Sequence, residues 1–350
     1  MTPPAAAILP SRNEAETIAA VVRAADAALD DPNAVIVHAD ASSGPETAAR
    51  FAAVPTTARK VGLTGLPLGK GIQVLHALAE LGIGTGPILI ADTDTRTPDP
   101  ALYRSLLERC TAGDAYAIAD YPRFWDEGNL TNHLARPLIA AATGLDIPQP
   151  LAGDLAMNTR AIEAATAAAS QLPPALATSV HGYGIDAFLL LTAARVGAVV
   201  TVRASAPKLH AASFPHLADI YDQAVPVLLA LTGPPTRTYR PAPVDYRLTE
   251  RELGHPQRSR MQDVLDALAP PDPRYDAHPW PAPVTEAWHR VTTGQASPHD
   301  ASAALRPYYI HRVRTWLTTP PTARAHLLVQ AHRQLAADLT HHQPARSNAP

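Results

Sequence analysis

The stretch GPILIADTDTRTPDP, residues 86–100, carries the strongest signal for fold and function in this chain. Its apolar run, residues 87–91, predicts a buried strand, and the run ends abruptly at Asp92, Thr93 and Asp94. Open α/β sheets bind ligands beyond the carboxyl ends of their strands, so two carboxylates at this place indicate a binding site. Hard anionic oxygens suit Mg²⁺ or Mn²⁺, and such a metal is most useful where the substrate is itself anionic, for example a nucleoside diphosphate.

Length and composition define the class of protein. With 350 residues, 46% of them hydrophobic, the chain can form one large domain or a domain with a sizeable extension. The single cysteine, Cys110, excludes an intrachain disulfide framework and a zinc site made of thiolates. The sequence therefore predicts a protein of the reducing cytoplasm whose core needs no covalent crosslinks.

Charge and hydropathy exclude two classes of partner. The formal net charge is −3 and there is no basic run, so nothing favours binding to nucleic acid or to an anionic membrane surface. No stretch approaches the roughly eighteen apolar residues of a membrane span, and the start MTPPAAAILPSRNE does not resemble a signal peptide. We expect a soluble, cytoplasmic protein that acts on small molecules.

The order of apolar and amphipathic segments predicts an α/β layout from residue 5 to about residue 205. Beyond residue 233 prolines accumulate, as in GPPTRTYRPAPV, and short helices joined by proline-rich connectors are expected. We therefore expect domains at 1–232 and 233–340 and a disordered tail at 341–350. The predicted strands are 5–9, 34–38, 88–91, 115–119 and 198–203, and the predicted helices are 13–29, 71–81, 99–110, 185–196, 260–267, 284–291 and 323–339.

The aspartate pair has alternative interpretations. An EF-hand loop needs a glycine at its sixth position and a glutamate at its twelfth, where this chain has Thr97 and Tyr103. A phosphatase of the haloacid-dehalogenase type would use Asp92 as nucleophile and usually has threonine or valine at the fifth position, where Arg96 stands. A third interpretation is a plain turn or helix cap. The EF-hand is excluded, and the metal site, the phosphatase and the cap remain open at this point.

Polar residues also follow the first two predicted strands. In ILPSRNEAETI, residues 8–18, Ser11 and Glu14 form a capping-box pattern, and the same helix start can line a nucleotide pocket. In VIVHADASSGPET, Asp40 and two serines follow the second strand, where a polar turn is the simpler interpretation. Both segments are consistent with a nucleotide site at the carboxyl edge of the sheet.

Lys70 lies between two glycines directly before a predicted helix, in LPLGKGIQVL. The segment is not a Walker A loop, because Thr64 stands where the first glycine belongs and Gly71 follows the lysine. A flexible lysine there can still reach a phosphate, and an ordinary solvated lysine is the alternative.

Later segments add carboxylates and a histidine. Asp154 follows a short turn in QPLAGD, and Asp186 opens an apolar helix in HGYGID, where it can also act as a cap. Lys208 and His210 follow a strand in ASAPKLHAASF. Because the segment lies after a strand, His210 is a candidate metal ligand rather than an ordinary surface histidine.

Taken in order, ILPSRNEAETI, VIVHADASS, GKG, ADTD, QPLAGD, GYGID and KLH resemble the GT-A glycosyltransferases, most closely the glucosyl-3-phosphoglycerate and mannosylglycerate synthase group, over about residues 5–215. The resemblance implies a Rossmann-like mixed sheet flanked by helices, with a helical, proline-rich C-terminal region. It also implies roles for particular residues. These are Pro10, Ser11, Asn13, Glu14, Asp40 or Ser42 for the nucleoside, Lys70 for the diphosphate, Asp92, Thr93, Asp94 and His210 for the metal and its diphosphate, and Gly153, Asp154 and Asp186 for the sugar and acceptor.

One segment concerns the acceptor. EGNLTNHLARPL, residues 127–138, resembles the stretch with which the phosphoglycerate-using members hold their substrate, and Gly128, Thr131 and Arg136 match it. Asn129 stands where that pattern has arginine. An amide cannot replace the bidentate phosphate contact of a guanidinium, so the resemblance leaves a phosphorylated acceptor in doubt.

We therefore expect a metal-dependent, retaining glycosyltransferase that moves a hexose from a UDP- or GDP-sugar, UDP-glucose being favoured, to a small hydroxylated acceptor without phosphate, as in specialised metabolism. Lys70, Asp154 and Asp186 are the expected catalytic residues, and Mg²⁺ or Mn²⁺ is the expected cofactor. Glucosyl-3-phosphoglycerate synthesis is the alternative, with Arg136 or Arg123 holding the phosphate. A phosphatase and a non-catalytic nucleotide-sugar binding protein are more remote. We expect the C-terminal aromatic residues to serve packing rather than a sugar platform, and the helices that carry them to cover the acceptor cleft or to form a homodimer surface.

Overall fold

The computed structural model describes residues 3–82, 85–210, 213–233 and 244–341. The chain divides into two compact units. Unit 1 consists of Met1–Pro122 and Gln149–Ala212, and unit 2 of Arg123–Pro148 and Ser213–Pro350. Each is described by itself. None of the helices in these residue ranges is both long enough and apolar enough to cross a membrane.

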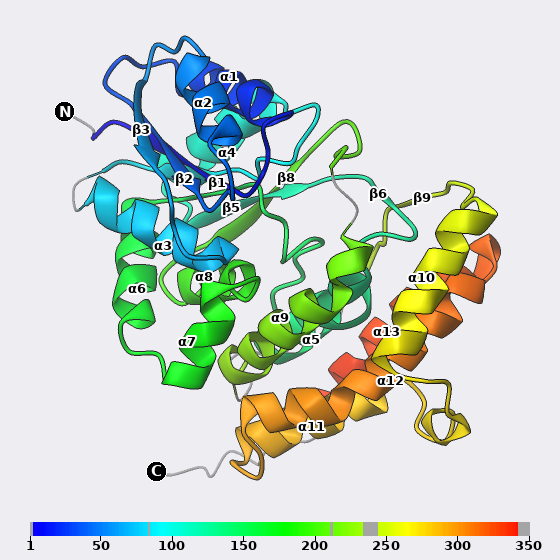
Figure 1. The fold of residues 1–350 in the computed structure, drawn as a ribbon. Coiled ribbons are helices and arrows are strands. Elements are labelled where there is room, and N and C mark those ends of the chain that lie inside the picture. Colours follow the sequence, from blue (N-terminus) through cyan, green and yellow to red (C-terminus); the bar gives the residue numbers. More distant parts are fainter. Residues whose placement is uncertain (1–2, 83–84, 211–212, 234–243, 342–350) are drawn as a thin grey trace, which may run out of the picture. The chain divides into compact units, whose positions relative to one another are not determined.

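Unit 1 is built on a seven-stranded mixed sheet with the order β3-β2-β1-β4-β7-β5-β8 (Figure 1). The strands β3, β2, β1 and β4 are parallel, β5 is parallel to β8, and β7 is antiparallel to both of its neighbours. The carboxyl ends of β1, β2 and β4 therefore meet at one edge. The bounds are β1 (Ala6–Ser11), β2 (Val35–Asp40), β3 (Arg59–Leu63), β4 (Ile88–Ile90), β5 (Tyr116–Asp120), β7 (Leu155–Met157) and β8 (Val199–Arg203).

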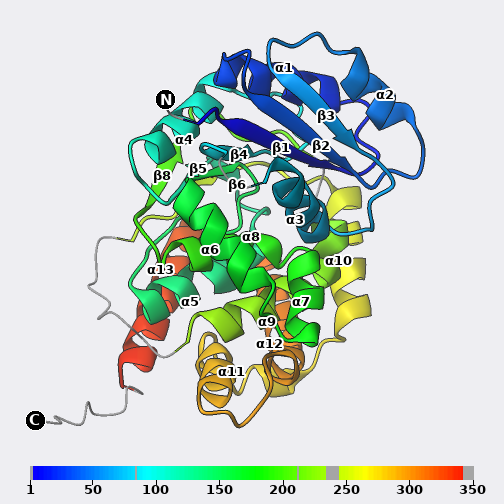
Figure 2. The same cartoon turned by 90° about the vertical axis from the view of Figure 1, so that its left-hand side faces the viewer.

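Helices cover both faces of this sheet (Figures 1 and 2). One face packs Ala7, Leu9 and Ile36 of the strands against apolar side chains of α1, α2 and α4, and these residues are buried. On the other face α3 packs against β1 and β2, and α6, α7 and α8 pack against α3. The bounds are α1 (Ile18–Leu29), α2 (Glu46–Ala53), α3 (Lys70–Leu81), α4 (Pro100–Thr111), α6 (Thr159–Ala169), α7 (Pro174–His181) and α8 (Ile185–Ala193).

The first helix begins five residues later than the sequence pattern predicts. Asn13 has a φ of 61°, in the left-handed region, and α1 starts at Ile18. The predicted capping box is not formed, because the Ser11 hydroxyl is hydrogen-bonded to His38 and Asp40 instead of a helix amide. The segment between β1 and α1 is therefore shaped by contacts with the end of β2.

Unit 2 is mainly helical, as expected for the C-terminal region. Trp125, Tyr309 and Trp316 are almost fully buried, which supports packing as the role of its aromatic residues, whereas a homodimer surface stays a prediction. The bounds are the paired strands β6 (Arg123–Phe124) and β9 (Leu248–Thr249), the π-helix η1 (Thr131–Ala135), the 3₁₀ turns η2 (Phe214–His216) and η3 (Pro273–Tyr275), and the helices α5 (Arg136–Thr143), α9 (Leu217–Leu231), α10 (His255–Leu268), α11 (Ala282–Thr292), α12 (Pro298–Thr318) and α13 (Pro321–His341).

The division differs from the expected boundary at residue 232, because residues 123–148 pack with the C-terminal helices. Arg136 on α5 forms a bidentate pair with Asp146, at 2.6 and 3.0 Å, and donates to the carbonyl of Asp245 at 2.7 Å. Its guanidinium also stacks on the ring of Tyr246, 4.4 Å from the centroid. The contacts with Asp245 and Tyr246 join residues more than a hundred positions apart. The tail expected to be disordered lies outside the described residues, except for its first position.

Because several histidines are buried, we expect the folded protein to lose stability in mild acid. Burial lowers the pKa of His38 and His332 to about 4, and that of His133 well below its ordinary value. Between pH 6.5 and 4 the unfolded chain binds protons that the folded chain does not, so the free energy of unfolding falls as the pH falls, by up to about 1.4 kcal/mol per pH unit for each histidine.

Chemical denaturation at about pH 7 and pH 5 measures this effect. Because carboxylates titrate in the same range, the informative comparison is with His332→Gln, which should lose less stability than the wild type between the two pH values. An identical loss in both proteins would contradict the prediction for His332.

Candidate active site

Asp92 lies between two lysines at the carboxyl end of β4. Its Oδ1 is 2.9 Å from Nζ of Lys70, and its Oδ2 is 2.8 Å from Nζ of Lys208. Burial alone would raise the pKa of Asp92, but Lys208 and Lys70 outweigh it and hold that pKa well below the ordinary value. Asp92 is therefore ionised at neutral pH and already paired with both cations.

Each lysine also contacts a second carboxylate. Lys70 lies 2.9 Å from Asp186 of α8, and Lys208 lies 2.8 Å from Asp154. The result is an alternating chain, Asp186, Lys70, Asp92, Lys208 and Asp154, which we call the charge chain. Burial would lower the pKa of the two lysines, but the carboxylates beside them raise both above ordinary values, so both lysines are charged.

Lys208 is the member of the charge chain to which the sequence analysis gave no role. Two features of the sequence weakly indicate a role for Lys208. It follows the predicted strand that corresponds to β8, and it lies two residues before His210. Because Lys208 is far from Asp92 in the sequence, no local pattern indicates that the two residues pair. A backbone hydrogen bond from the amide of Arg96 to the carbonyl of Leu209, at 2.8 Å, fixes the Lys208 segment against the turn that follows Asp94.

Asp154 is engaged by protein groups on both oxygens. Its side chain is 0% exposed. Oδ1 accepts from the backbone amide of Asp92 at 3.0 Å, and Oδ2 accepts from the hydroxyl of Tyr121 at 2.6 Å. These contacts hold Asp154 against Asp92 and Lys208, and a direct contact with the sugar or the acceptor stays a prediction.

Glycines in two of the predicted motifs are required by close packing. A Cβ on Gly153 would lie 2.1 Å from both carboxylate oxygens of Asp92, so any side chain there would displace Asp92. A Cβ on Gly71 would lie 1.8 Å from the carbonyl oxygen of Val180 in α7. Lys70 was expected to be flexible between its glycines. The structure instead gives these glycines a packing role and fixes Lys70 by ion pairs.

Asp94 and His210, the two residues expected to bind the metal directly, lie close together in the candidate site. Nδ1 of His210 lies 3.8 Å from Oδ2 of Asp94, and both side chains are partly accessible. Burial and the nearby carboxylates of Asp92 and Asp154 raise the pKa of Asp94 to about 6. A carboxylate crowded by other carboxylates and facing an imidazole is a suitable place for a divalent cation with oxygen and nitrogen ligands.

The predicted third ligand, Asp92, is held by its lysines. Within residues 3–82, 85–210, 213–233 and 244–341, no three histidine, cysteine or acidic side chains come together as a closed metal cluster. The fit is therefore to a cation held directly by Asp94 and His210 and completed by oxygens of a ligand. Asp92 was expected to act through water, and its two ion pairs are consistent with an indirect role.

A polar cradle lies at the carboxyl ends of β1 and β2, where the nucleoside was expected. The amide of Asn13 donates to Oγ of Ser42 at 2.7 Å, and Oδ1 of Asn13 accepts from the amide of Ser43 at 3.0 Å. Oδ1 of Asp40 accepts from the amide of Ser42 at 2.9 Å. Ser11, Asn13, Asp40 and Ser42 therefore come together as the resemblance implies.

The remaining predicted donor-site residues adjoin the cradle. Burial, followed by the charge of Asp94, raises the pKa of Glu14, so this carboxylate lies within electrostatic reach of the aspartate turn. Oγ1 of Thr93 donates to the carbonyl of Pro10 at 2.7 Å and is buried. Thr93 and Pro10 thus join the ends of β4 and β1, and their contact is structural.

The segment expected to bind the acceptor belongs to unit 2. Arg136 is buried, pairs with Asp146, donates to the carbonyl of Asp245 and stacks on the ring of Tyr246, and its expected role in binding the acceptor stays a prediction. Nδ2 of Asn129 donates to the carbonyl of Asp126 at 3.0 Å. Gly128, with a φ of 62°, lies beside Arg123, and Thr131 is buried at the start of η1.

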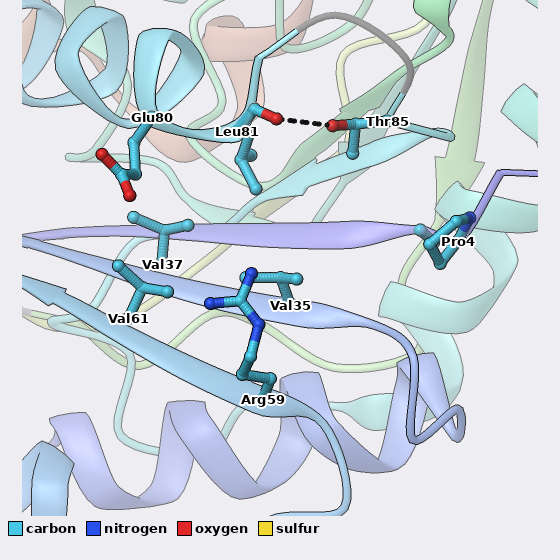
Figure 3. A pocket seen from close by; sticks show the side chains of 9 residues that line it. Pro4, Val35, Val37, Arg59, Val61, Glu80, Leu81 and Thr85 are labelled. Atoms are coloured by element: carbon cyan, nitrogen blue, oxygen red, sulfur yellow. Dashed lines mark hydrogen bonds between the residues drawn. The ribbon is translucent and has the colours of Figure 1, made fainter.

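A groove of about 200 Å³ also opens on unit 1, and Figure 3 shows the side chains that line it. Val35, Val37 and Val61 form its apolar floor, and Arg59 and Glu80 lie beside them. Val35 and Arg59 are the first residues of β2 and β3, so the groove lies toward the amino ends of the strands. It is therefore separate from the charge chain and the cradle, which lie at the carboxyl ends.

Comparisons with solved structures find the same fold in a known enzyme. A structure of glucosyl-3-phosphoglycerate synthase from Mycobacterium tuberculosis in complex with phosphoglyceric acid is 25% identical to this chain, with a TM-score of 0.51, and the match covers 67% of this chain and 81% of that one. A structure of the same enzyme with Mn²⁺, uridine-diphosphate-glucose and glycerol 3-phosphate is 25% identical, with a TM-score of 0.50 and coverages of 67% and 82%.

Comparisons that use the sequence alone find no similar protein. No model of a protein family matches the chain, and no curated protein matches it. The structural neighbours confirm the predicted GT-A fold, a mixed α/β sheet flanked by helices, and these neighbours are glycosyltransferases. The predicted class of enzyme is thereby supported.

Proposed function

We propose that this protein is a metal-dependent, retaining hexosyltransferase that uses a UDP-sugar, UDP-glucose being favoured, and a small hydroxylated acceptor in the cytoplasm. The observation that carries the proposal is the charge chain beside Asp94 and His210 at the carboxyl edge of a GT-A sheet. Two lysines and a metal ligand pair directed to one place suit a diphosphate leaving group. Mn²⁺ and uridine-diphosphate-glucose occur together in a structural neighbour.

The roles of the residues follow from their charges and exposure. Asp94 and His210 would hold Mg²⁺ or Mn²⁺, which supplies Lewis-acid stabilisation of the departing diphosphate when bound. Lys70 and Lys208 would turn from Asp92 toward the phosphate oxygens and add positive charge there. Asp186, whose pKa burial raises to about 6 despite Lys70, would orient the sugar or the acceptor.

The transfer exchanges one bond at the anomeric carbon. The bond from this carbon to the diphosphate oxygen breaks, and its electron pair leaves with the diphosphate. The acceptor hydroxyl forms the new bond on the same face and passes its proton to a departing phosphate oxygen. Lys70 and Lys208 stabilise the charge that develops on that group, and no covalent enzyme intermediate is needed.

Glucosyl-3-phosphoglycerate synthesis is the second candidate, because both structural neighbours belong to an enzyme of that name. Arg123 favours it, since the guanidinium lies 3.4 Å from the Cβ position of Gly128, next to Asn129. Asn129 favours an acceptor without phosphate, because it has no charge of its own. The acceptor class is therefore the point at which the two candidates separate.

A donor panel tests the proposal. With Mn²⁺ and no acceptor, we expect slow hydrolysis of UDP-glucose, no hydrolysis of a generic phosphate ester, and loss of the activity on chelation. The reaction is measured as release of UDP. Addition of 3-phosphoglycerate or of glycerate then identifies the acceptor class by the faster transfer. Hydrolysis of the generic ester, or hydrolysis of UDP-glucose that persists under chelation, would contradict the proposed reaction.

A further inference from the structure

His38 is a polar residue inside the core of unit 1. It lies on β2, is 0% exposed, and its ring stacks on Phe51 of α2 with the centroids 4.6 Å apart. Because burial lowers its pKa to about 4, the ring is neutral at neutral pH. A buried polar side chain costs free energy unless it is hydrogen-bonded, so the partner of His38 indicates what the residue does.

That partner is the hydroxyl of Ser11 at the end of β1. Nε2 of His38 lies 2.6 Å from Oγ of Ser11, and the Ser11 hydroxyl donates to Oδ1 of Asp40 at 3.1 Å. A hydroxyl has one proton, so His38 must donate from Nε2 to Ser11. Nδ1 of His38 then carries no proton, and it has no partner in the described part of the chain. His38 therefore donates to Ser11, and Ser11 donates to Asp40.

Asp40 receives these donors on one oxygen only. Oδ1 accepts from the hydroxyl of Ser11, from the amide of Ser42 and from the hydroxyl of Ser42. These three donors use the full hydrogen-bonding capacity of Oδ1. The second oxygen, Oδ2, accepts from no donor in the part of the chain that the structure describes, and the carboxylate is only 3% exposed. The protein thus holds a carboxylate with one oxygen hydrogen-bonded and the other without a donor in the described part of the chain.

We propose that His38 is a positioning residue that acts through Ser11 to present Oδ2 of Asp40 to the nucleobase, and that this single acceptor selects a base with one ring N–H between two carbonyls, such as uracil. The inference rests on the proposed function, which supplies a nucleotide donor. Guanine offers two adjacent N–H groups that match both oxygens of a carboxylate, and Oδ1 is already filled. Adenine and cytosine place a ring acceptor beside the carboxylate, which is repulsive.

The test compares binding of UDP and GDP in the presence of Mn²⁺ by calorimetry. His38→Phe keeps a buried ring against Phe51 but removes the donor to Ser11. We expect UDP binding to weaken by about 10-fold and the preference for UDP over GDP to fall by a similar factor. In the transfer assay, KM for the donor should rise by about 10-fold while kcat changes by less than about 3-fold, because the reacting atoms are not touched.

Conservative variants separate positioning from packing. His38→Gln can place a donor near the position of Nε2, so it should restore most of the UDP preference. Ser11→Ala should reproduce His38→Phe, and the double variant should be no worse than either single one. Phe51→Leu removes the stacking partner and is expected to lower stability with the UDP preference unchanged.

The outcomes distinguish this inference from the proposed function. If the wild type binds UDP but His38→Phe and Ser11→Ala retain the full preference over GDP, the role of His38 is overturned and the proposed function stands. If His38→Phe does not fold, Ser11→Ala and His38→Gln still give the result. If the wild type binds neither nucleotide, both the inference and the proposed function are overturned.

Discussion

Replacing Lys208 with methionine is expected to lower the free energy of unfolding by about 3–5 kcal/mol and the rate of sugar transfer by at least about 100-fold. The loss of stability follows from Asp154, which is 0% exposed and would lose the cation with which it is paired. The loss of activity follows from the removal of one of the two cations that we propose to stabilise the leaving diphosphate. Chemical denaturation and the UDP-release assay measure the two effects on the same protein.

A second substitution separates the two effects. Lys208→Met combined with Asp154→Asn removes both charges, and the amide can still accept from the amide of Asp92 and donate to the hydroxyl of Tyr121. We expect most of the stability to return and the activity to stay low. Lys60→Met is the matched control, because Lys60 donates only to carbonyls at the end of α2 and should leave activity unchanged. Recovery of activity in the double variant would refute a role for Lys208 in transfer.

The sequence predicted which residues meet at the carboxyl edge of the sheet where this depends on local position. Asp92, Asp94 and Asp40 follow predicted strands, and Lys70 starts a predicted helix, so their meeting at one edge follows from the parallel arrangement of β1, β2 and β4. The predicted strands 5–9, 34–38, 88–91, 115–119 and 198–203 lie within two residues of the observed bounds of β1, β2, β4, β5 and β8. By contrast, β7 has three residues and lies antiparallel between β4 and β5, a pairing that no local pattern indicates.

Side-chain partners across the fold could not be predicted, because they depend on burial and on contacts between distant segments. Ser11 looked like a helix cap but bonds to the end of β2. Asp154 and Arg136 matched family motifs by residue type, yet both are buried and fully engaged with protein groups. Lys208 is 116 positions from Asp92, so only the folded chain shows that they form a pair.

Loss of the two proposed metal ligands, Asp94 and His210, is expected to have the largest effect on activity. Asp94→Asn exchanges an anionic ligand for a neutral one, and we expect transfer to fall by about 1,000-fold or more, with a similar loss for His210→Ala. The same substitutions should abolish the rise in melting temperature that Mn²⁺ gives the wild type, because a ligand that binds only the folded state stabilises it. Thermal unfolding with and without Mn²⁺ measures this independently of turnover.

The electrostatics of the site allow this experiment to separate loss of activity from loss of stability. Burial and the charges of Asp92 and Asp154 raise the pKa of Asp94, which means that its carboxylate is unfavourable in the metal-free fold. Asp94→Asn removes that repulsion, so the metal-free variant should be at least as stable as the wild type, and lost activity cannot come from unfolding. Asp186→Asn is the matched comparison, since it should lose transfer but keep the response to Mn²⁺. A normal Mn²⁺ response in Asp94→Asn would place the metal elsewhere.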